Sequence, residues 1–224
     1  KLILIDPRKI ELADFATLHL RQKPGSDVAL FNAMAHVIIA EGLTNAAFIA
    51  GRTEGYEALV EAVKDCTPER AEGISGVPAE QIREAARLYA QAKSAAIFWA
   101  MGITQHTTGT DNVKVLSNLA LLTGQIGRPG TGLNPLRGQN NVQGACDVGG
   151  LPNVFPGYQT VTSEEVRHKF AAAWHIPYEQ LSPTPGLTIT EIMHGITDGR
   201  IKAVFVMGEN PMLSDPDLTH VEEA

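Results

Sequence analysis

Short apolar runs alternate with segments of helical periodicity over the first 130 residues, and this alternation constrains the fold more than any other feature. Continuous apolar runs at 2–5, 18–20 and 95–99 predict buried strands. Apolar residues recur at helical spacing over 28–38 and 82–89, and a third helix is expected at 111–122. Strands that alternate with helices indicate an α/β fold with a doubly wound, Rossmann-like sheet.

Local signals place the ends of these helices. Ser26 or Asp27 is expected to cap the helix that begins near residue 28, by accepting hydrogen bonds from its first amides. Pro68 and Pro78 stand where a first helical turn tolerates a missing amide hydrogen. Gly124 follows the helix at 111–122, as a C-terminal glycine commonly does.

The character of the sequence changes at residue 128. Glycine, proline and side-chain amides dominate 128–158 without a usable periodicity, which predicts a long functional loop. Helices are then expected at 164–174 and 190–197, and a strand at 203–206 runs into a glycine turn at 207–211. We therefore predict two lobes, residues 1–137 with one αβα architecture and residues 138–224 with part of a second.

Charge and composition exclude several classes of protein. Lys and Arg number 18 against 25 Asp and Glu, and the net charge of −7 makes a nucleic-acid partner unlikely on electrostatic grounds. The apolar stretches are too short for a membrane span. The two cysteines lie far apart, and the seven histidines lack metal-ligand spacing, so neither a disulfide framework nor a histidine metal site is predicted.

The densest group of chemically versatile residues surrounds Arg137. Four side-chain amides lie within residues 139–143, between two glycines, and such a tract suits a polar heterocycle and a small anion. Taken alone, the tract is more typical of a solvated surface loop in which Arg137 is an ordinary surface cation. Asp27 has a helix cap as its structural alternative, Asp6 a turn with Pro7, and Met101 simple core packing.

The segments RGQNNVQGACDVGGLPNVFPGYQ, IDPRKIE, PGSDVALFNAMAHVI and VMGENP together resemble the catalytic subunits of molybdenum- or tungsten-dependent formate dehydrogenases. These subunits belong to the larger family that binds molybdopterin guanine dinucleotide. The resemblance covers the whole chain and implies two such cofactors, each lying across one α/β lobe, which hold the metal through dithiolene sulfurs. It also implies that formate is oxidised to carbon dioxide, with two electrons passing to the metal and on to electron-transfer subunits.

The resemblance assigns roles to individual residues. Arg137 matches the arginine beside the metal, where a guanidinium fork can hold both oxygens of formate. The positions matched to the guanosine end of one cofactor are Asp6, Arg8, Gly25 and Asp27. Those matched to the pterin are Met101, Gly102, Gln105, Gly138 and Gln139. Those matched to the second nucleotide are Gly208, Glu209, Asn210 and Ser214.

Other family features have no counterpart among these 224 residues. They are a cysteine or selenocysteine ligand to the metal, a histidine that follows it, and a Cys-rich motif for a 4Fe-4S cluster. Because the first residue is Lys1, the chain is expected to be an internal portion of a longer cytoplasmic protein and to be inactive alone. A nitrate reductase-like enzyme and a non-catalytic scaffold in an electron-transfer complex remain alternatives.

Overall fold

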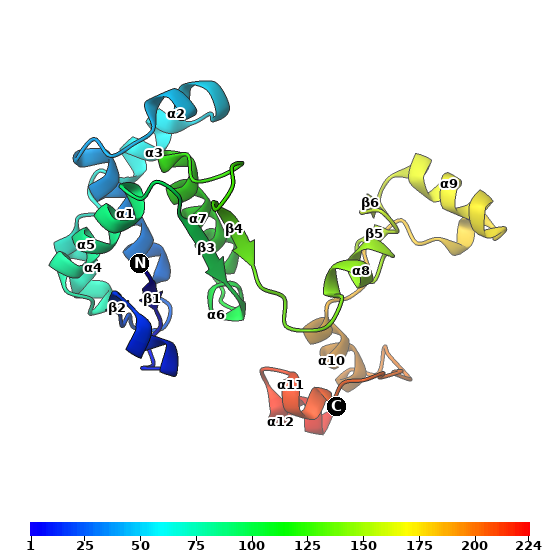
Figure 1. Ribbon diagram of the computed structural model, residues 1–224. Coiled ribbons are helices and arrows are strands. Elements are labelled where there is room, and N and C mark those ends of the chain that lie inside the picture. Colours follow the sequence, from blue (N-terminus) through cyan, green and yellow to red (C-terminus); the bar gives the residue numbers. More distant parts are fainter. The chain divides into compact units, whose positions relative to one another are not determined.

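The computed structural model describes residues 1–224 and divides them into unit 1, Lys1–Gly138, and unit 2, Gln139–Ala224 (Figure 1). Both units are mainly helical and contain short strands. The assignment of 1–137 and 138–224 to cofactor-binding lobes stays a prediction. None of the helices is both long enough and apolar enough to cross a membrane.

Unit 1 contains four strands, seven α-helices and one 3-10 helix. They are β1 (Ile3–Ile5), η1 (Glu11–Phe15), β2 (Leu18–Leu20), α1 (Asp27–Ala40), α2 (Ala46–Arg52), α3 (Tyr56–Val63), α4 (Pro68–Ser75), α5 (Ala79–Ala90), β3 (Ala96–Trp99), α6 (Met101–Thr104), α7 (Gly109–Thr123) and β4 (Gly132–Pro135). The order confirms the predicted strands at 2–5, 18–20 and 95–99 and the helices that follow them.

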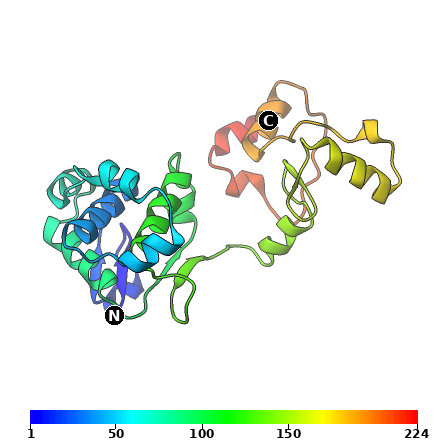
Figure 2. The ribbon, with the colours of Figure 1, turned by 90° about the horizontal axis from the view of Figure 1, so that it is seen from above.

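The core of unit 1 is built around α1, which packs against α3, α4, α5 and α7. Helix α1 is apolar on nearly every face, as expected of a helix with neighbours on all sides, and Leu30 and Ile38 are fully buried. Leu20 of β2 and Trp99 of β3 belong to the same hydrophobic cluster. Figure 2 shows the helices of unit 1 gathered around its short strands. The side chains of β2 and β3 therefore pack against the helices of unit 1.

The predicted doubly wound sheet is found only in part. Strands β1 and β2 pair in parallel, and β3 and β4 pair in parallel, but the two pairs are separate two-stranded sheets. Each strand has only three or four residues and uses one edge for its ladder hydrogen bonds. The prediction of parallel strands is confirmed, and the prediction of one continuous sheet within this chain is wrong.

Unit 2 contains one strand pair and several helices. They are α8 (Val142–Asp147), β5 (Val154–Phe155), β6 (Gln159–Thr160), α9 (Glu164–Trp174), η2 (Tyr178–Gln180), α10 (Ile189–Thr197), α11 (Pro211–Ser214) and α12 (Leu218–Glu223). Helix α9 has the bounds predicted from the sequence, 164–174. The strands β5 and β6 are antiparallel.

A small aromatic cluster holds α9 against β5. The rings of Phe155 and Phe170 stack with centroids 4.7 Å apart, and Trp174 meets the Phe155 ring edge-on at 5.7 Å. Both phenylalanines are buried. This contact, rather than a sheet, provides the local core of this part of unit 2.

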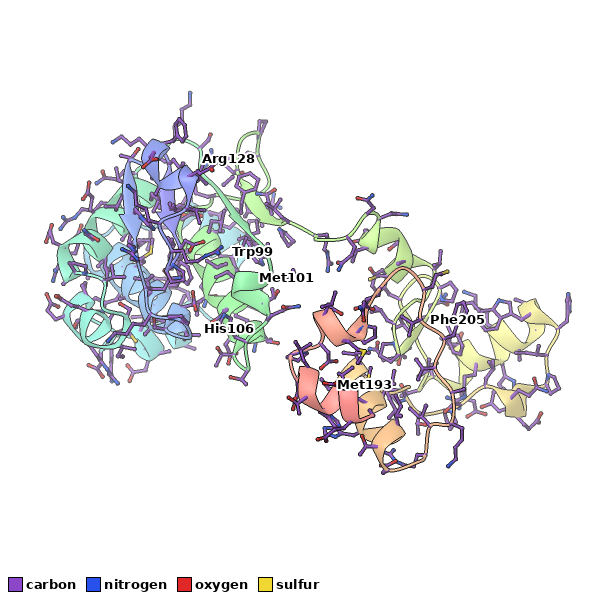
Figure 3. All side chains as sticks on the ribbon, turned by 90° about the horizontal axis from the view of Figure 1, so that it is seen from below. Trp99, Met101, His106, Arg128, Met193 and Phe205 are labelled. Carbon is purple, nitrogen blue, oxygen red and sulfur yellow. The ribbon has the colours of Figure 1, made fainter.

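The strand predicted at 203–206 does not form. Residues 201–207 have no regular structure, and Phe205 and Met207 are more than 80% exposed (Figure 3). A strand is stable only when a neighbouring strand accepts and donates its backbone hydrogen bonds, and no strand among residues 1–224 pairs with this segment. The prediction of a strand at 203–206 is therefore wrong, and the assignment of 138–224 to part of a second lobe stays a prediction.

Two further predictions need correction. The loop expected over 128–158 contains β4, α8 and β5, because short elements of two to six residues leave little periodic signal. Neither Ser26 nor Asp27 caps α1 with its side chain. The Ser26 hydroxyl instead donates back to the Lys23 carbonyl over 2.6 Å.

Candidate functional site

The end of β1 is held against the end of β2 by backbone contacts. The Asp6 amide donates to the last carbonyl of β2 over 3.1 Å, and Arg21 donates from Nε and Nη2 to the Pro7 carbonyl, each over 3.2 Å. Asp6 Oδ1 accepts the Arg8 amide hydrogen at 2.7 Å, so this carboxylate also forms a turn. Asp6 and Arg8 lie at the carboxyl edge of parallel strands, where α/β sheets bind ligands.

A glycine turn follows β2 at the same edge. Gly25 has a φ of +81°, and a Cβ at this position would meet no atom within 4 Å. The turn is held in place because the Lys23 amide donates to the carbonyl of buried Ser75 over 2.8 Å. Open space at the Cβ position of Gly25 allows a ligand to approach the backbone of the turn closely.

Asp27 is the first residue of α1 and is only 3% exposed. Its Oδ1 accepts a hydrogen bond of 3.2 Å from Nε2 of Gln22, which is also buried. Oδ2 of Asp27 accepts no hydrogen bond from another residue. Sequence reasoning missed Gln22, because a single glutamine after a strand carries no pattern.

The ends of β3 and β4 bring a second group of predicted residues together. The Leu136 amide donates to the Trp99 carbonyl over 2.7 Å, which extends the ladder beyond β4. Met101 begins α6 directly after β3, is 48% exposed, and lies with its Cε 3.8 Å from the position of a Cβ added at Gly138. Met101 is therefore not a core residue, and the alternative of simple packing is excluded.

The short helix α6 presents the remaining residues of this group. Gly102 and Gln105 are exposed, and the Gln105 amide closes the helix on the Met101 carbonyl at 2.9 Å. His106 Nε2 lies 2.8 Å from the Gly102 carbonyl oxygen. Asn112 at the start of α7 donates to the Ile103 carbonyl over 2.8 Å. These contacts tie α6 to α7, which lie together in Figure 3.

Arg137 lies between Leu136 and Gly138, just past the end of β4. Its side chain is exposed, forms no ion pair and donates no hydrogen bond within the chain. A guanidinium with all its donors free can hold a planar carboxylate in a bidentate manner. The geometry therefore suits the predicted binding of a small carboxylate.

A buried polar clamp, which sequence reasoning also missed, fixes the other end of the β3–β4 pair. Gln125 is 2% exposed; its Oε1 accepts from the Ala95 amide (3.0 Å) and from Arg128 Nη2 (2.9 Å). Its Nε2 donates to the Ala92 carbonyl over 2.7 Å, and Arg128 Nη1 donates to the Lys93 carbonyl over 2.9 Å. In Figure 3, Arg128 and Met101 mark opposite ends of this strand pair.

The amide tract after Arg137 is only partly free for a ligand. Asn141 caps α8, with its Oδ1 accepting the Gly144 amide hydrogen at 3.1 Å. Gln143 Nε2 donates to Asp147 Oδ1 over 3.0 Å and to the Tyr158 hydroxyl over 2.8 Å. Gln139, in contrast, is exposed and makes no side-chain hydrogen bond. This tract falls in the segment predicted as a long loop, and it instead begins a helix because Asn141 supplies the cap.

The last predicted group lies together in unit 2. Gly208 has a φ of +72° with open space at its Cβ position. Asn210 caps α11 by accepting the Met212 amide hydrogen at 3.1 Å, and the Ser214 hydroxyl donates to Glu209 Oε1 over 2.7 Å. The glycine turn and its polar neighbours are thus preformed as one local structure.

These residues fit the nucleotide ends of a dinucleotide cofactor. The Asp27 carboxylate can accept from guanine N–H or ribose O–H groups, and the open glycine turns admit a close approach to the backbone. No group of three or more His, Cys, Asp and Glu side chains within residues 1–224 is arranged to hold a metal ion directly. A metal at this site would need other ligands.

Comparison with known proteins identifies the family of the chain. The whole chain, residues 1–224, matches the family described as Molybdopterin oxidoreductase. It is 51% identical over all 224 residues to formate dehydrogenase H of Escherichia coli, covering 31% of that protein. It is also 51% identical to the alpha subunit of an F420-dependent formate dehydrogenase of Methanococcus maripaludis, covering 32% of it, and 35% identical to a nitrate reductase of Synechocystis, covering 31%.

A solved structure gives a similar result. Acetylene hydratase from Pelobacter acetylenicus matches 58% of this chain with a TM-score of 0.56 and 31% sequence identity, over 18% of its own length. The chain belongs to the molybdopterin oxidoreductase family, and within it is closely related to formate dehydrogenases. The chain spans about a third of the length of the formate dehydrogenases it matches.

Proposed function

We propose that these residues form part of a formate dehydrogenase catalytic subunit that oxidises formate to carbon dioxide. The observation that carries this proposal is Arg137. Its unpaired guanidinium belongs to the residue between the end of β4 and Gly138, at the carboxyl edge of a parallel strand pair, in a chain 51% identical throughout to two formate dehydrogenases. When bound, the metal and its dithiolene ligands would supply the acceptor for two electrons.

Arg137 would bind and orient the substrate. Formate is a planar carboxylate, and two parallel N–H···O bonds from one guanidinium fix both its oxygens and the direction of its C–H bond. The reaction releases carbon dioxide and one proton and delivers two electrons. Lysine would keep the positive charge but lose the planar fork, so the two side chains are not equivalent here.

The finer features of the cofactor follow as parts of the same proposal. Asp6, Arg8, Gly25 and Asp27 would hold one guanosine end of a bis-molybdopterin guanine dinucleotide cofactor carrying molybdenum or tungsten. Met101, Gly102, Gln105, Gly138 and Gln139 would line the pterin, and Gly208, Glu209, Asn210 and Ser214 would meet the second nucleotide. The 4Fe-4S cluster, the electron-transfer subunits, a cytoplasmic location and the completed doubly wound sheets belong to the proposal for the parent protein.

The test uses the full-length protein and follows formate oxidation with an artificial electron acceptor. Replacing one preorganised donor commonly lowers turnover by roughly 10²- to 10³-fold, and we expect a loss of that order in kcat/KM for Arg137→Ala. Arg137→Lys should recover only part of the loss. The matched control is Arg52→Ala, which removes an exposed arginine that makes no ion pair or side-chain hydrogen bond, and it should leave turnover unchanged. Equal formate turnover in Arg137→Ala and wild type would refute the role of Arg137.

A nitrate reductase is the second candidate, because the chain is 35% identical to one and nitrate is also a planar anion. Turnover of nitrate without turnover of formate by the full-length protein would favour this alternative. A purified protein that contains neither molybdenum nor tungsten would point instead to a non-catalytic relative.

A further inference from the structure

The pair formed by Gln22 and Asp27 carries an inference beyond the roles just described, although it rests on the proposed cofactor. Gln22 follows the last residue of β2 by two positions and is only 7% exposed. Its Nε2 donates to Oδ1 of Asp27 at 3.2 Å, while its own Oε1 is buried and has no hydrogen-bond partner. The amide nitrogen of Gln22 therefore has a hydrogen-bond partner, and the amide oxygen has none.

An unpaired buried oxygen is unfavourable. A buried acceptor without a donor costs about 1–3 kcal/mol, and an unbranched apolar side chain of similar length avoids that cost entirely. Gln22 thus occupies a position in the core where methionine would pack without leaving a polar atom unsatisfied. Residues that lower stability in this way are typical of functional sites.

The contact made by Nε2 shows what the glutamine contributes. Asp27 is buried to 97% and has no cationic partner, so only hydrogen bonds and the amides of the first turn of α1 stabilise its charge. With Oδ1 accepting from Gln22, the carboxylate plane is fixed, and Oδ2 accepts no hydrogen bond from another residue. The glycine turn around Gly25 stands between the two residues in the chain and has open space at its Cβ position.

We propose that Gln22 is a positioning residue that holds the Asp27 carboxylate ready for the donor edge of a guanine base. Gln22 acts through Asp27, which would contact the base. Guanine offers the N1 and N2 hydrogens side by side. A carboxylate held in one plane can accept one on Oδ2 and the other on the second lone pair of Oδ1, whereas a rotating carboxylate does so less often. Hypoxanthine lacks the N2 amine. Orientation of Asp27 by Gln22 therefore contributes to the preference for guanine over hypoxanthine as well as to the affinity for guanine.

The test measures nucleotide binding in the full-length protein prepared without its pterin cofactor. GDP and inosine 5′-diphosphate are titrated by calorimetry into wild type and Gln22→Met. Since a hydrogen bond of this kind is worth about 1 kcal/mol, we expect GDP affinity to fall roughly 5-fold and the preference for GDP over inosine diphosphate to shrink. We expect the thermal unfolding midpoint to change little, because removal of the unsatisfied Gln22 Oε1 offsets the loss of the hydrogen bond to Asp27 Oδ1.

That combination separates positioning from a structural role. A structural residue would lower the unfolding midpoint and leave the ratio of the two nucleotide affinities unchanged, and that result would overturn the proposal. The matched control is Tyr89→Phe, which removes another buried oxygen without a hydrogen-bond partner, and it should leave both affinities unchanged. If wild type binds GDP and Gln22→Met binds it equally well and with equal discrimination, only the positioning role fails. If wild type binds no GDP, the proposed cofactor fails with it.

Discussion

Replacing Gln125 with leucine tests how the β3–β4 pair is held in place. The amide side chain joins three elements: Ala92 after α5, Ala95 before β3, and Arg128 before β4. Leucine has a similar volume and makes none of these hydrogen bonds. Each lost bond costs about 1 kcal/mol, so Gln125→Leu should lower the free energy of unfolding by about 3 kcal/mol. For a unit of this size that corresponds to a fall in Tm on the order of 10 °C.

Hydrogen exchange gives the second measurement in the same protein. The Ala95 amide donates its hydrogen bond to the Gln125 side chain, so exchange of the Ala95 amide hydrogen should speed up in the variant. The assay is thermal unfolding of the full-length protein together with exchange followed by mass spectrometry over peptide 92–99. Gln91→Leu is the matched control, since Gln91 is exposed and its side chain makes no hydrogen bond. Unchanged Tm and unchanged exchange in Gln125→Leu would refute the account of the clamp.

The remaining predictions concern Tyr89 and two glycines. Burial, partly offset by the nearby Thr123 hydroxyl, raises the pKa of Tyr89 to about 12, so its stabilising contribution is complete below pH 10 and is lost as the pH rises towards 12. Urea unfolding at pH 9 and pH 11.5 should show a smaller alkaline loss in Tyr89→Phe than in wild type, by about 2 kcal/mol at most; equal losses would contradict this. Gly124→Ala should destabilise by about 1–3 kcal/mol, because φ is +64° and the new Cβ would lie 2.8 Å from Asn45 Nδ2. Gly51→Ala, in open space within α2, should raise Tm slightly instead, and a fall in both variants would argue against the conformational explanation.

Helices were the part of the fold that local sequence predicted well. The helix at 164–174 begins after Ser163, whose side chain accepts the Val166 amide hydrogen, and ends before a left-handed His175. Helix α7 ends at Thr123 and is followed by Gly124, which is also left-handed, with a φ of +64°. Apolar spacing, caps and C-terminal glycines act over one or two turns, so the sequence carries them directly.

Strands were less predictable, since a strand depends on a partner elsewhere in the chain. The run at 96–99 pairs with 132–135, a segment that had been expected to lack regular structure. The apolar run at 203–206 has the composition of a strand but no partner within these residues, and it remains extended and exposed. Composition predicts that a segment favours a strand, and only the fold decides whether a neighbour is present.

The candidate site divides in the same way. Sequence by itself determined the family, through a resemblance that extends over the whole chain, and that resemblance singled out Arg137, Gly25 and Asp27. Only the tertiary structure showed that Arg137 has no intramolecular partner and that Gln22 fixes one oxygen of Asp27. The reason is physical: residue type sets which hydrogen bonds a side chain can make, whereas burial and the distance to its neighbours decide which of them it does make.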